Sequence, residues 1–448
     1  MKPRKPKLLI VFAALLCTAA FCCGCAEESV DGSAGAVPAG AQVTADGFAF
    51  SAGARMITDV DGLMGNPVAN TENGRYQVLP REDGSENIIY IDYATRSCIY
   101  LCNRPECLHS DASCPAWLSA EDCAGGAGFF TDGETLYLQR MGAGSDPGNP
   151  GDVTETSASQ ITRMDLNGDN RELLYRLEGA ACIAGSIAKD GNMMYFLQDH
   201  VESAQDDVQV IRQLVALDTV QKAVTPLVTV NTDYYLLGVC DAGFLLKTLE
   251  VQGDDFTTRS TIYLYRTRTG EIEPIKQWTE DNIITRVYKN KIYAIDPGKA
   301  ALLEIDPETK EETVLAKDLP LNADDTVRPE GIYDGHFCFY IFEHGVRSVE
   351  TKRDYAVELQ TGSFLERTLG YITADGIPRA VSLMAEAPDS FFVDYGSERV
   401  TVQSTNPDGS VFSFEAERRL VGLIAKEDYW NNIPNYQPIE IPENMLLY

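Results

Sequence analysis

One unit of sequence recurs along most of this chain, and it restricts the fold more than any other feature does. Each unit has a turn with Asp-Gly or a similar pair, a short apolar strand with aromatic residues, a polar gap, a second strand, a further turn and a third strand. Examples begin at Phe129, Ser186, Gly238, Val287 and Gly331. Successive units are roughly 45 to 55 residues apart, within the range of four-stranded propeller blades. The pattern predicts an all-β fold of repeated antiparallel sheets.

The turns and strands inside each unit are those of β-hairpins. In "MDLNGDNREL", Asn167-Gly168 can supply the two positive-φ residues of a type I′ turn, so we expect the flanking strands to pair antiparallel. The segments "TLYLQ" and "TIYLYRT" alternate aromatic and aliphatic residues, as half-buried strands do. Adding one unit at the front, from Asn87, and one at the back, from Ser390, gives seven candidate blades. Six or eight blades would also fit, and the competing folds are a pair of β-sandwiches and an open β-solenoid.

The phrase "ITRMDLNG", from Ile161 to Gly168, resembles the blade pattern of low-density-lipoprotein-receptor-type and TolB-like β-propellers. The resemblance covers most of the chain beyond Tyr76. It implies a ring of sheets whose loops lie at the two faces of a disc. Loops on a rigid scaffold are where ligands are usually held, so the fold analogy implies a binding or interaction module.

The N-terminus has the composition of an export signal. Basic residues precede an apolar run from Leu8 to Cys23, which is shorter than the ~20 residues that span a bilayer comfortably. Gly24 before Cys25 resembles the lipobox of bacterial lipoproteins, although Cys22 stands where an aliphatic residue is usual. This resemblance implies that Cys25 carries the lipid, such as palmitate, that anchors the protein. The alternatives are a plain secretory signal and an uncleaved anchor.

The sequence thus divides into four expected parts. They are a lipoprotein signal peptide (1–24), a lipidated N-terminus with a flexible tether and entry segment (25–75), the propeller (76–430) and a C-terminal strap (431–448). The tether is expected because a stretch rich in Ala, Gly and Ser cannot bury a core. We expect the protein at the extracytoplasmic face of a bacterial cell membrane, of Gram-positive type, with the lipid anchor as its only membrane contact.

The chain is strongly acidic, with a formal net charge of −30 at pH 7. The first 24 residues carry four basic and no acidic side chains, so their removal would leave a net charge of −34. Such a surface repels nucleic acid and anionic lipid headgroups. We therefore expect no nucleic-acid partner, and an envelope glycan, peptide or protein as the ligand, which the sequence does not identify.

Three cysteines and one histidine lie within the fourteen residues of "LCNRPECLHSDASC". They are Cys102, Cys107, His109 and Cys114, called here the Cys–His cluster. Three thiolates and an imidazole suit a tetrahedral zinc site, but the spacing lacks the paired C-x₂-C of well-defined zinc motifs. An exported protein can form disulfides instead, and Cys98 and Cys123 offer further thiols. On sequence alone we prefer disulfide pairing within the cluster. A structural zinc ion and free thiols are the alternatives, and no other cofactor is expected.

The longer segment "CNRPECLHSDASCPAW" resembles a phrase in lipoproteins of anaerobic Gram-positive bacteria, a resemblance that implies no activity. The mature sequence has no G-x-S-x-G, H-E-x-x-H or P-loop match. With 67 acidic residues, a glycosidase-like pair of carboxylates cannot be chosen from sequence, so the catalytic residues stay unknown. We therefore favour a binding module over an enzyme. The second hypothesis is a carbohydrate-active hydrolase or lyase that uses acidic residues near the propeller channel. The third is an accessory subunit of an envelope transport or secretion complex.

Overall fold

The chain divides into two units, residues 1–39 and 40–448. The computed structural model describes residues 47–58, 68–81, 83–123, 126–141, 158–178, 181–204, 207–252, 257–279, 283–322, 324–349, 352–405, 410–442 and 445, all in the second unit. The predicted signal peptide, Cys25 and most of the predicted tether lie outside the described residues. In the described part of the chain, no helix has the length and apolarity that crossing a membrane requires.

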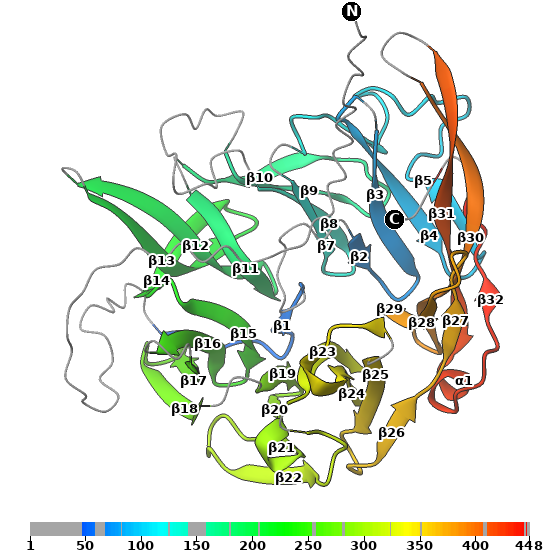
Figure 1. Ribbon diagram of the computed structural model, residues 1–448. Helices are drawn as coiled ribbons and strands as arrows, with labels where there is room; N and C mark the ends of the chain where they lie inside the picture. Colours follow the sequence, from blue (N-terminus) through cyan, green and yellow to red (C-terminus); the bar gives the residue numbers. More distant parts are fainter. Residues whose placement is uncertain are drawn as a thin grey trace, which may run out of the picture. The chain divides into compact units, whose positions relative to one another are not determined.

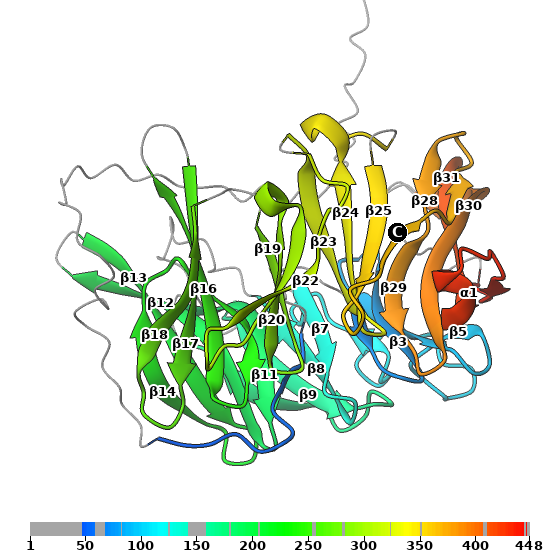
Figure 2. The ribbon, with the colours of Figure 1, turned by 90° about the horizontal axis from the view of Figure 1, so that it is seen from below.

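Within the described residues, seven antiparallel sheets of four or more strands follow one another around a central axis (Figure 1). Each sheet is built from consecutive strands, and its first blade strand lies innermost. Figure 2 shows the same sheets from the side. The chain is a seven-bladed β-propeller. The prediction of an all-β propeller with seven blades is confirmed.

The blades are numbered in chain order, and their strands are given from the axis outward. Blade 1 contains β2 (Val68–Asn70), β3 (Gly74–Pro80), β4 (Glu86–Asp92) and β5 (Ser97–Tyr100). Blade 2 contains β7 (Ala127–Thr131), β8 (Thr135–Arg140), β9 (Gln160–Asp165) and β10 (Glu172–Arg176). Blade 3 contains β11 (Ala181–Asp190), β12 (Met193–Ala204), β13 (Asp207–Asp218) and β14 (Ala223–Val230). Blade 4 contains β15 (Tyr234–Cys240), β16 (Gly243–Gln252), β17 (Thr257–Arg266) and β18 (Ile272–Trp278).

The remaining blades follow the same plan. Blade 5 contains β19 (Ile284–Tyr288), β20 (Lys291–Asp296), β21 (Ala301–Ile305) and β22 (Glu312–Ala316). Blade 6 contains β23 (Thr326–Tyr333), β24 (His336–Phe342), β25 (Lys352–Glu358) and β26 (Phe364–Arg367). Blade 7 contains β29 (Ser382–Glu386), β30 (Ser390–Thr405), β31 (Val411–Ala425) and β32 (Gln437–Pro438). Between blades 6 and 7 the chain forms the pair β27 (Gly370–Ile372) and β28 (Pro378–Ala380). The helix α1 (Lys426–Trp430) follows β31.

Apolar side chains fill the spaces between neighbouring blades, so that many strands are buried on both faces. One core joins Val78 and Ile88 of blade 1 to Phe129 and Leu136 of blade 2. Burying such a side chain contributes about 1.5–3 kcal/mol. This two-sided burial explains why the strands read as nearly continuous apolar and aromatic runs, since each face packs against a different blade.

Among the described residues, blades 7 and 1 exchange no strand where the ring closes, because each of these sheets is built from its own consecutive segment. Ile91 of blade 1 packs in one core with Phe392 and Leu423 of blade 7. Beyond β32, Glu440 forms a parallel bridge with Ser97 of β5. Side-chain packing and the C-terminal segment therefore close the ring.

The N-terminal segment adds to the inside of blade 3 and to its contact with blade 4. The short strand β1 (Arg55–Met56) pairs with β11, the innermost strand of blade 3. Ahead of it, the Phe50 ring packs edge-on against Phe244 of blade 4 at 4.9 Å between centroids. The main-chain N–H of Phe48 donates to the carbonyl of Thr267 at 2.9 Å. These contacts fix the entry segment before the first blade begins.

The turn predicted at Asn167-Gly168 is longer than a type I′ hairpin turn. Strand β9 ends at Asp165 and β10 begins at Glu172, and the described positive-φ residues in this turn are Gly168 (φ 82°) and Asn170 (φ 54°). The Asn170 amide donates to the Asp165 carboxylate at 2.6 Å. This side-chain bond stabilises a six-residue connection, so the prediction of a two-residue turn was wrong although the strands pair antiparallel as expected.

Candidate metal centre

The Cys–His cluster lies in the connection that leaves blade 1 toward blade 2. After β5 the chain forms an irregular loop, and then β6 (Trp117–Leu118) returns to pair with the start of β4. Leu101, Cys114 and Ala116 of this loop are buried in the core that blades 1 and 2 share. The loop is therefore part of the interface between the two blades.

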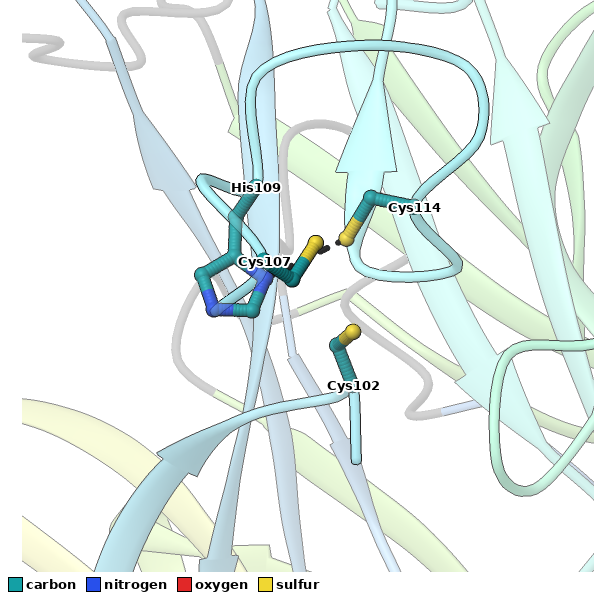
Figure 3. Close-up of side chains that lie close together, drawn as sticks. All are labelled: Cys102, Cys107, His109 and Cys114. Carbon is teal, nitrogen blue, oxygen red and sulfur yellow. Dashed lines mark hydrogen bonds between the residues drawn. The ribbon is translucent and has the colours of Figure 1, made fainter. Parts of the chain in front are cut away.

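The structure brings all four predicted residues together (Figure 3). Their potential ligand atoms, three Sγ atoms and one imidazole nitrogen, all lie within 4.8 Å of one another. Among them, His109 Nδ1 and Cys114 Sγ lie 3.3 Å apart. In a tetrahedral site with Zn–S distances near 2.3 Å, the ligand atoms are about 3.5–3.8 Å apart. The cluster therefore matches the identity, number and approximate spacing of a Cys₃His zinc site.

Backbone N–H groups point at two of the sulfur atoms. The N–H of Ala116 donates to Cys114 Sγ at 3.3 Å. The N–H of His109 donates to the Cys107 sulfur, and this bond is the main reason why the pKa of Cys107 is lowered from its usual value. Donors of this kind favour the thiolate over the thiol, and the thiolate is the form that binds metal.

Burial acts in the opposite direction on Cys114, whose thiol is nearly inaccessible. It raises the pKa of Cys114 to about 12. Burial also lowers the pKa of the His109 imidazole, which keeps that ring neutral and able to act as a ligand. A zinc ion deprotonates a coordinating thiol outright, so a cation would compensate the buried sulfur.

The position of His109 is fixed by its surroundings. Its ring stacks on Tyr100 of β5 at 4.3 Å between centroids. Its main-chain carbonyl accepts a 2.8 Å hydrogen bond from the buried side-chain amide of Asn87 and a 3.3 Å bond from Arg81. His109 and Glu106 both have positive φ, 51° and 58°. These two reversals fold the loop back on itself and direct His109 toward the cysteines.

Blade 2 holds the same loop from the other side. The guanidinium of Arg171, in the turn between β9 and β10, donates to the carbonyls of Pro115 and Trp117. A Cβ added at Gly168 would lie 2.9 Å from the carbonyl oxygen of Pro115. The turn of blade 2 thus lies directly against the end of the cysteine loop.

None of the cysteines that the structure describes forms a disulfide. Cys98 lies elsewhere, with its Sγ 3.6 Å from Met445 Sδ, and Cys123 makes a side-chain hydrogen bond with Glu86. Neither is a member of the cluster. Disulfide pairing, which we prefer on sequence alone, stays a prediction, whereas the geometry favours metal.

The sequence did not indicate a second group, Asp324, Asp325 and His344, whose ligand atoms also approach one another. Its members already have protein partners: Asp325 accepts from the backbone of Asn322 and of His344, and the His344 ring lies 3.0 Å from Asp324. These bonds join the loop before β23 to the loop after β24. The group is explained by loop packing.

A cavity of about 990 Å³ lies among the innermost strands of several blades. Sequence reasoning missed it. We call it the channel cavity. It is lined by residues 55–58, 68–73, Arg75, 129–134, Tyr333 and 384–386. These residues come from β1, its continuation and blades 1, 2, 6 and 7. No sequence motif indicates the cavity, because residues from five separate segments form it.

Neither the protein-family models nor the curated proteins give a match to this sequence. Among solved structures, the chain is similar to TolB from Acinetobacter baumannii, with 10% identity over 79% of this chain and 77% of that chain and a TM-score of 0.33. It is also similar to the β-propeller domain of the Trilobed protease from Pyrococcus furiosus, with 11% identity, 82% and 97% coverage and a TM-score of 0.40. An acylaminoacyl peptidase from Pyrococcus horikoshii gives 12% identity and a TM-score of 0.44, and the match covers 82% of this chain and 57% of that longer chain. Similarity at this level concerns the fold alone.

Proposed function

We propose that this chain is a lipid-anchored extracytoplasmic β-propeller that acts as a binding module, with a structural zinc ion in its Cys–His cluster. The observation that carries the binding function is the channel cavity, whose volume of about 990 Å³ is that of a small-ligand site. The zinc ion belongs to the scaffold that holds this site, since it would cross-link a loop that packs between blades 1 and 2, and both blades line the cavity.

The ligand set favours a structural ion over a catalytic one. Three thiolates and one imidazole complete a tetrahedral zinc shell, whereas catalytic sites keep one position open for water or substrate. Soft sulfur ligands also select zinc over magnesium, calcium or manganese. The chemistry expected of the ion is therefore cross-linking of the loop.

A cross-link is useful at this position because the loop has little regular structure of its own. Between the end of β5 at Tyr100 and the start of β6 at Trp117, it has no strand or helix. One ion would join the beginning, the middle and the end of this loop, at Cys102, Cys107 and Cys114. Metal bound only by the folded loop adds its binding free energy to folding.

The test is metal analysis of the purified chain together with a thiol count, with and without reductant. We expect one zinc per chain. The cluster thiols should react fully only when the protein is unfolded in the presence of a chelator. Cys107→Ser and His109→Ala should each lose the zinc. Cys182→Ser, which changes a half-buried cysteine in blade 3, is the matched control and should keep it. Metal-free protein with oxidised cluster cysteines would contradict the zinc proposal and support disulfides.

The proposed location depends on sequence, since residues 1–46 lie outside the described part of the chain. The basic start, the apolar run and Cys25 support export and acylation. A bacterial host that processes lipoproteins should incorporate labelled fatty acid into the wild type. Cys25→Ser should abolish the label and release the protein from the membrane fraction. Label on Cys25→Ser, or none on the wild type, would contradict the anchor.

The binding function is tested on the purified chain with a panel of glycan and peptide fragments, paired with turnover assays. We expect saturable binding without turnover, and weaker binding when a residue that lines the channel cavity is changed. Turnover that one cavity carboxylate controls would instead support the enzyme hypothesis.

A further inference from the structure

A buried arginine lines the channel cavity where blade 1 meets blade 7. Arg75 is the second residue of β3, and only 7% of its surface is exposed. Its Nη1 donates to the carbonyl of Met384 at 3.2 Å and to the Asn70 side chain at 3.3 Å. Its Nε is buried without a hydrogen-bond partner. The guanidinium thus has more donors than its surroundings satisfy.

Arg75 has no carboxylate partner among the described residues. Arg367, buried to the same degree as Arg75, pairs with Glu330 at 2.5 Å. The half-buried Arg212 pairs with Asp199 through Nε and Nη2, both at 2.6 Å. The chain has 67 acidic and 37 basic residues, so acidic partners are plentiful. Within the described residues, the lack of a carboxylate at Arg75 therefore does not reflect a shortage of acidic side chains.

Such an arrangement is costly for the protein alone. Burying a guanidinium without a counter-charge removes its hydration, and no ion pair replaces the lost interaction energy. A cation–π contact with the Phe392 ring, 5.6 Å from the guanidinium carbon, compensates only in part. Burial lowers the pKa of Arg75 to about 10, so the group still carries its charge at neutral pH. A buried charge at the wall of a cavity is a mark of a binding site.

The other charges at the cavity leave the positive charge of Arg75 uncompensated. Asp132 is already bound to Lys189 and to the Tyr137 hydroxyl, and Glu386 is bound to Lys426. Glu72 and Glu134 also line the cavity but lie in exposed turns. Arg55, a second cation of the lining, donates to the carbonyl of Asp132 at 2.6 Å. Neutral side chains, including those of Asn70, Thr71 and Asn73, supply further hydrogen-bonding groups.

We propose that the channel cavity binds a small organic carboxylate, whose oxygens accept hydrogen bonds from Arg75. The planar fork of a guanidinium matches a carboxylate, and a desolvated pair of this kind is strong. The ligand class is a carboxylate of sugar or amino-acid size, such as a uronic acid or the C-terminal unit of a peptide. This inference rests on the proposed binding function and names its ligand chemistry.

The experiment measures binding to the purified chain by calorimetry, with matched probes that differ in charge. Glucuronate is compared with glucose, and N-acetylalanine with N-acetylalanine amide, so that the two arms distinguish a sugar from an amino-acid carboxylate. We expect one carboxylate to bind and its neutral counterpart to bind at least about thirtyfold more weakly. Arg75→Met should reduce the affinity for that carboxylate by a similar factor.

Stability separates a ligand-binding role from a structural one. Without ligand, Arg75→Met should melt at the same temperature as the wild type or higher, because it removes an uncompensated buried charge. The matched control Arg212→Met should melt lower, since it leaves Asp199 unpaired, and should bind the probe as the wild type does.

Three results would overturn the inference. They are equal binding of charged and neutral probes, no binding of either carboxylate, and an Arg75→Met variant that melts lower while its affinity is unchanged. Neutral fragments that bind in the cavity would leave the binding module standing while the carboxylate assignment falls. If no member of the glycan and peptide panel binds, both the binding function and the carboxylate assignment are contradicted.

Discussion

The guanidinium of Arg171 in blade 2 donates a 2.6 Å hydrogen bond to the carbonyl of Trp117, the first residue of β6 on blade 1. It also bonds the carbonyl of Pro115, directly after Cys114. One side chain therefore joins the turn of blade 2 to the end of the cysteine loop. Arg171 thus holds from blade 2 the same loop that the Cys–His cluster would cross-link from within.

Replacing Arg171 should weaken the contact between blades 1 and 2 without removing metal. Arg171→Met loses two hydrogen bonds at an exposed position, so we expect a decrease of about 1–2 kcal/mol in the free energy of unfolding. Urea denaturation measures the decrease, and metal analysis should still find one zinc per chain. Loss of the zinc together with Arg171 would show that the loop depends on this side chain for its conformation.

Gly168 should be required for a reason that Gly133 does not share. Both have positive φ, 82° and 94°, but a Cβ at Gly168 would lie 2.9 Å from the Pro115 carbonyl, whereas a Cβ at Gly133 would meet nothing within 4 Å. Gly133→Ala should cost about 1–2 kcal/mol from backbone conformation alone. Gly168→Ala should cost about 1–3 kcal/mol more from overpacking against the loop. Equal losses in urea denaturation would mean that the two sites do not differ in packing.

Lys247 should make the free energy of unfolding of the propeller increase with pH in the alkaline range. It is 6% exposed, its Nζ donates to Thr285 Oγ1 at 3.0 Å, and burial lowers its pKa from 10.5 to about 8. Between about pH 8 and pH 10.4 the unfolded chain binds more protons at this site than the folded chain does, so its contribution to stability increases with pH. Below pH 8 both states are protonated, and the buried charge is a full penalty.

The comparison variant for that prediction is Lys247→Met, which cannot titrate. At pH 7 it should melt higher than the wild type, and the difference should shrink as the pH increases from 8 to about 10.4. Thermal melts at several pH values measure it, and taking the difference between the two proteins removes other titrating groups. A difference that stays constant across this range would contradict a lowered pKa.

The cluster residues should act as one unit rather than as separate contributors. Without chelator, Cys107→Ser should melt at a clearly lower temperature than the zinc-loaded wild type. With chelator present, the wild type should melt at the same temperature as Cys107→Ser, because the interaction that the serine removes is already lost. Additive effects of chelator and mutation would place the stabilising role of Cys107 outside metal binding.

The blade repeat could be predicted because each unit carries its own local pattern of turn and strand. The length of the turn at Asn167 could not be predicted, because it depends on a side-chain hydrogen bond from Asn170 to Asp165. The spacing of residues alone does not reveal that bond. The identity of the cluster residues was visible in the sequence. The loop conformation that gathers their side chains was not, because it depends on positive φ at Glu106 and His109.

Arg75 shows a different limit of sequence reasoning. It lies in an ordinary strand sequence, and nothing near it in the chain predicts burial of its charge. Its burial arises from Met384 and Phe392 of blade 7, about three hundred residues away, which pack on it when the ring closes. Contacts between the first and last blades cannot be predicted from one sequence without the fold.

X-ray absorption at the zinc edge on the purified chain tests the central claim most directly. The account predicts a first shell of three sulfur atoms at about 2.3 Å and one nitrogen at about 2.0 Å. His109→Ala, which should lose the zinc, should give no zinc-edge signal above background. A protein that contains no zinc, or zinc held by oxygen ligands only, would contradict it.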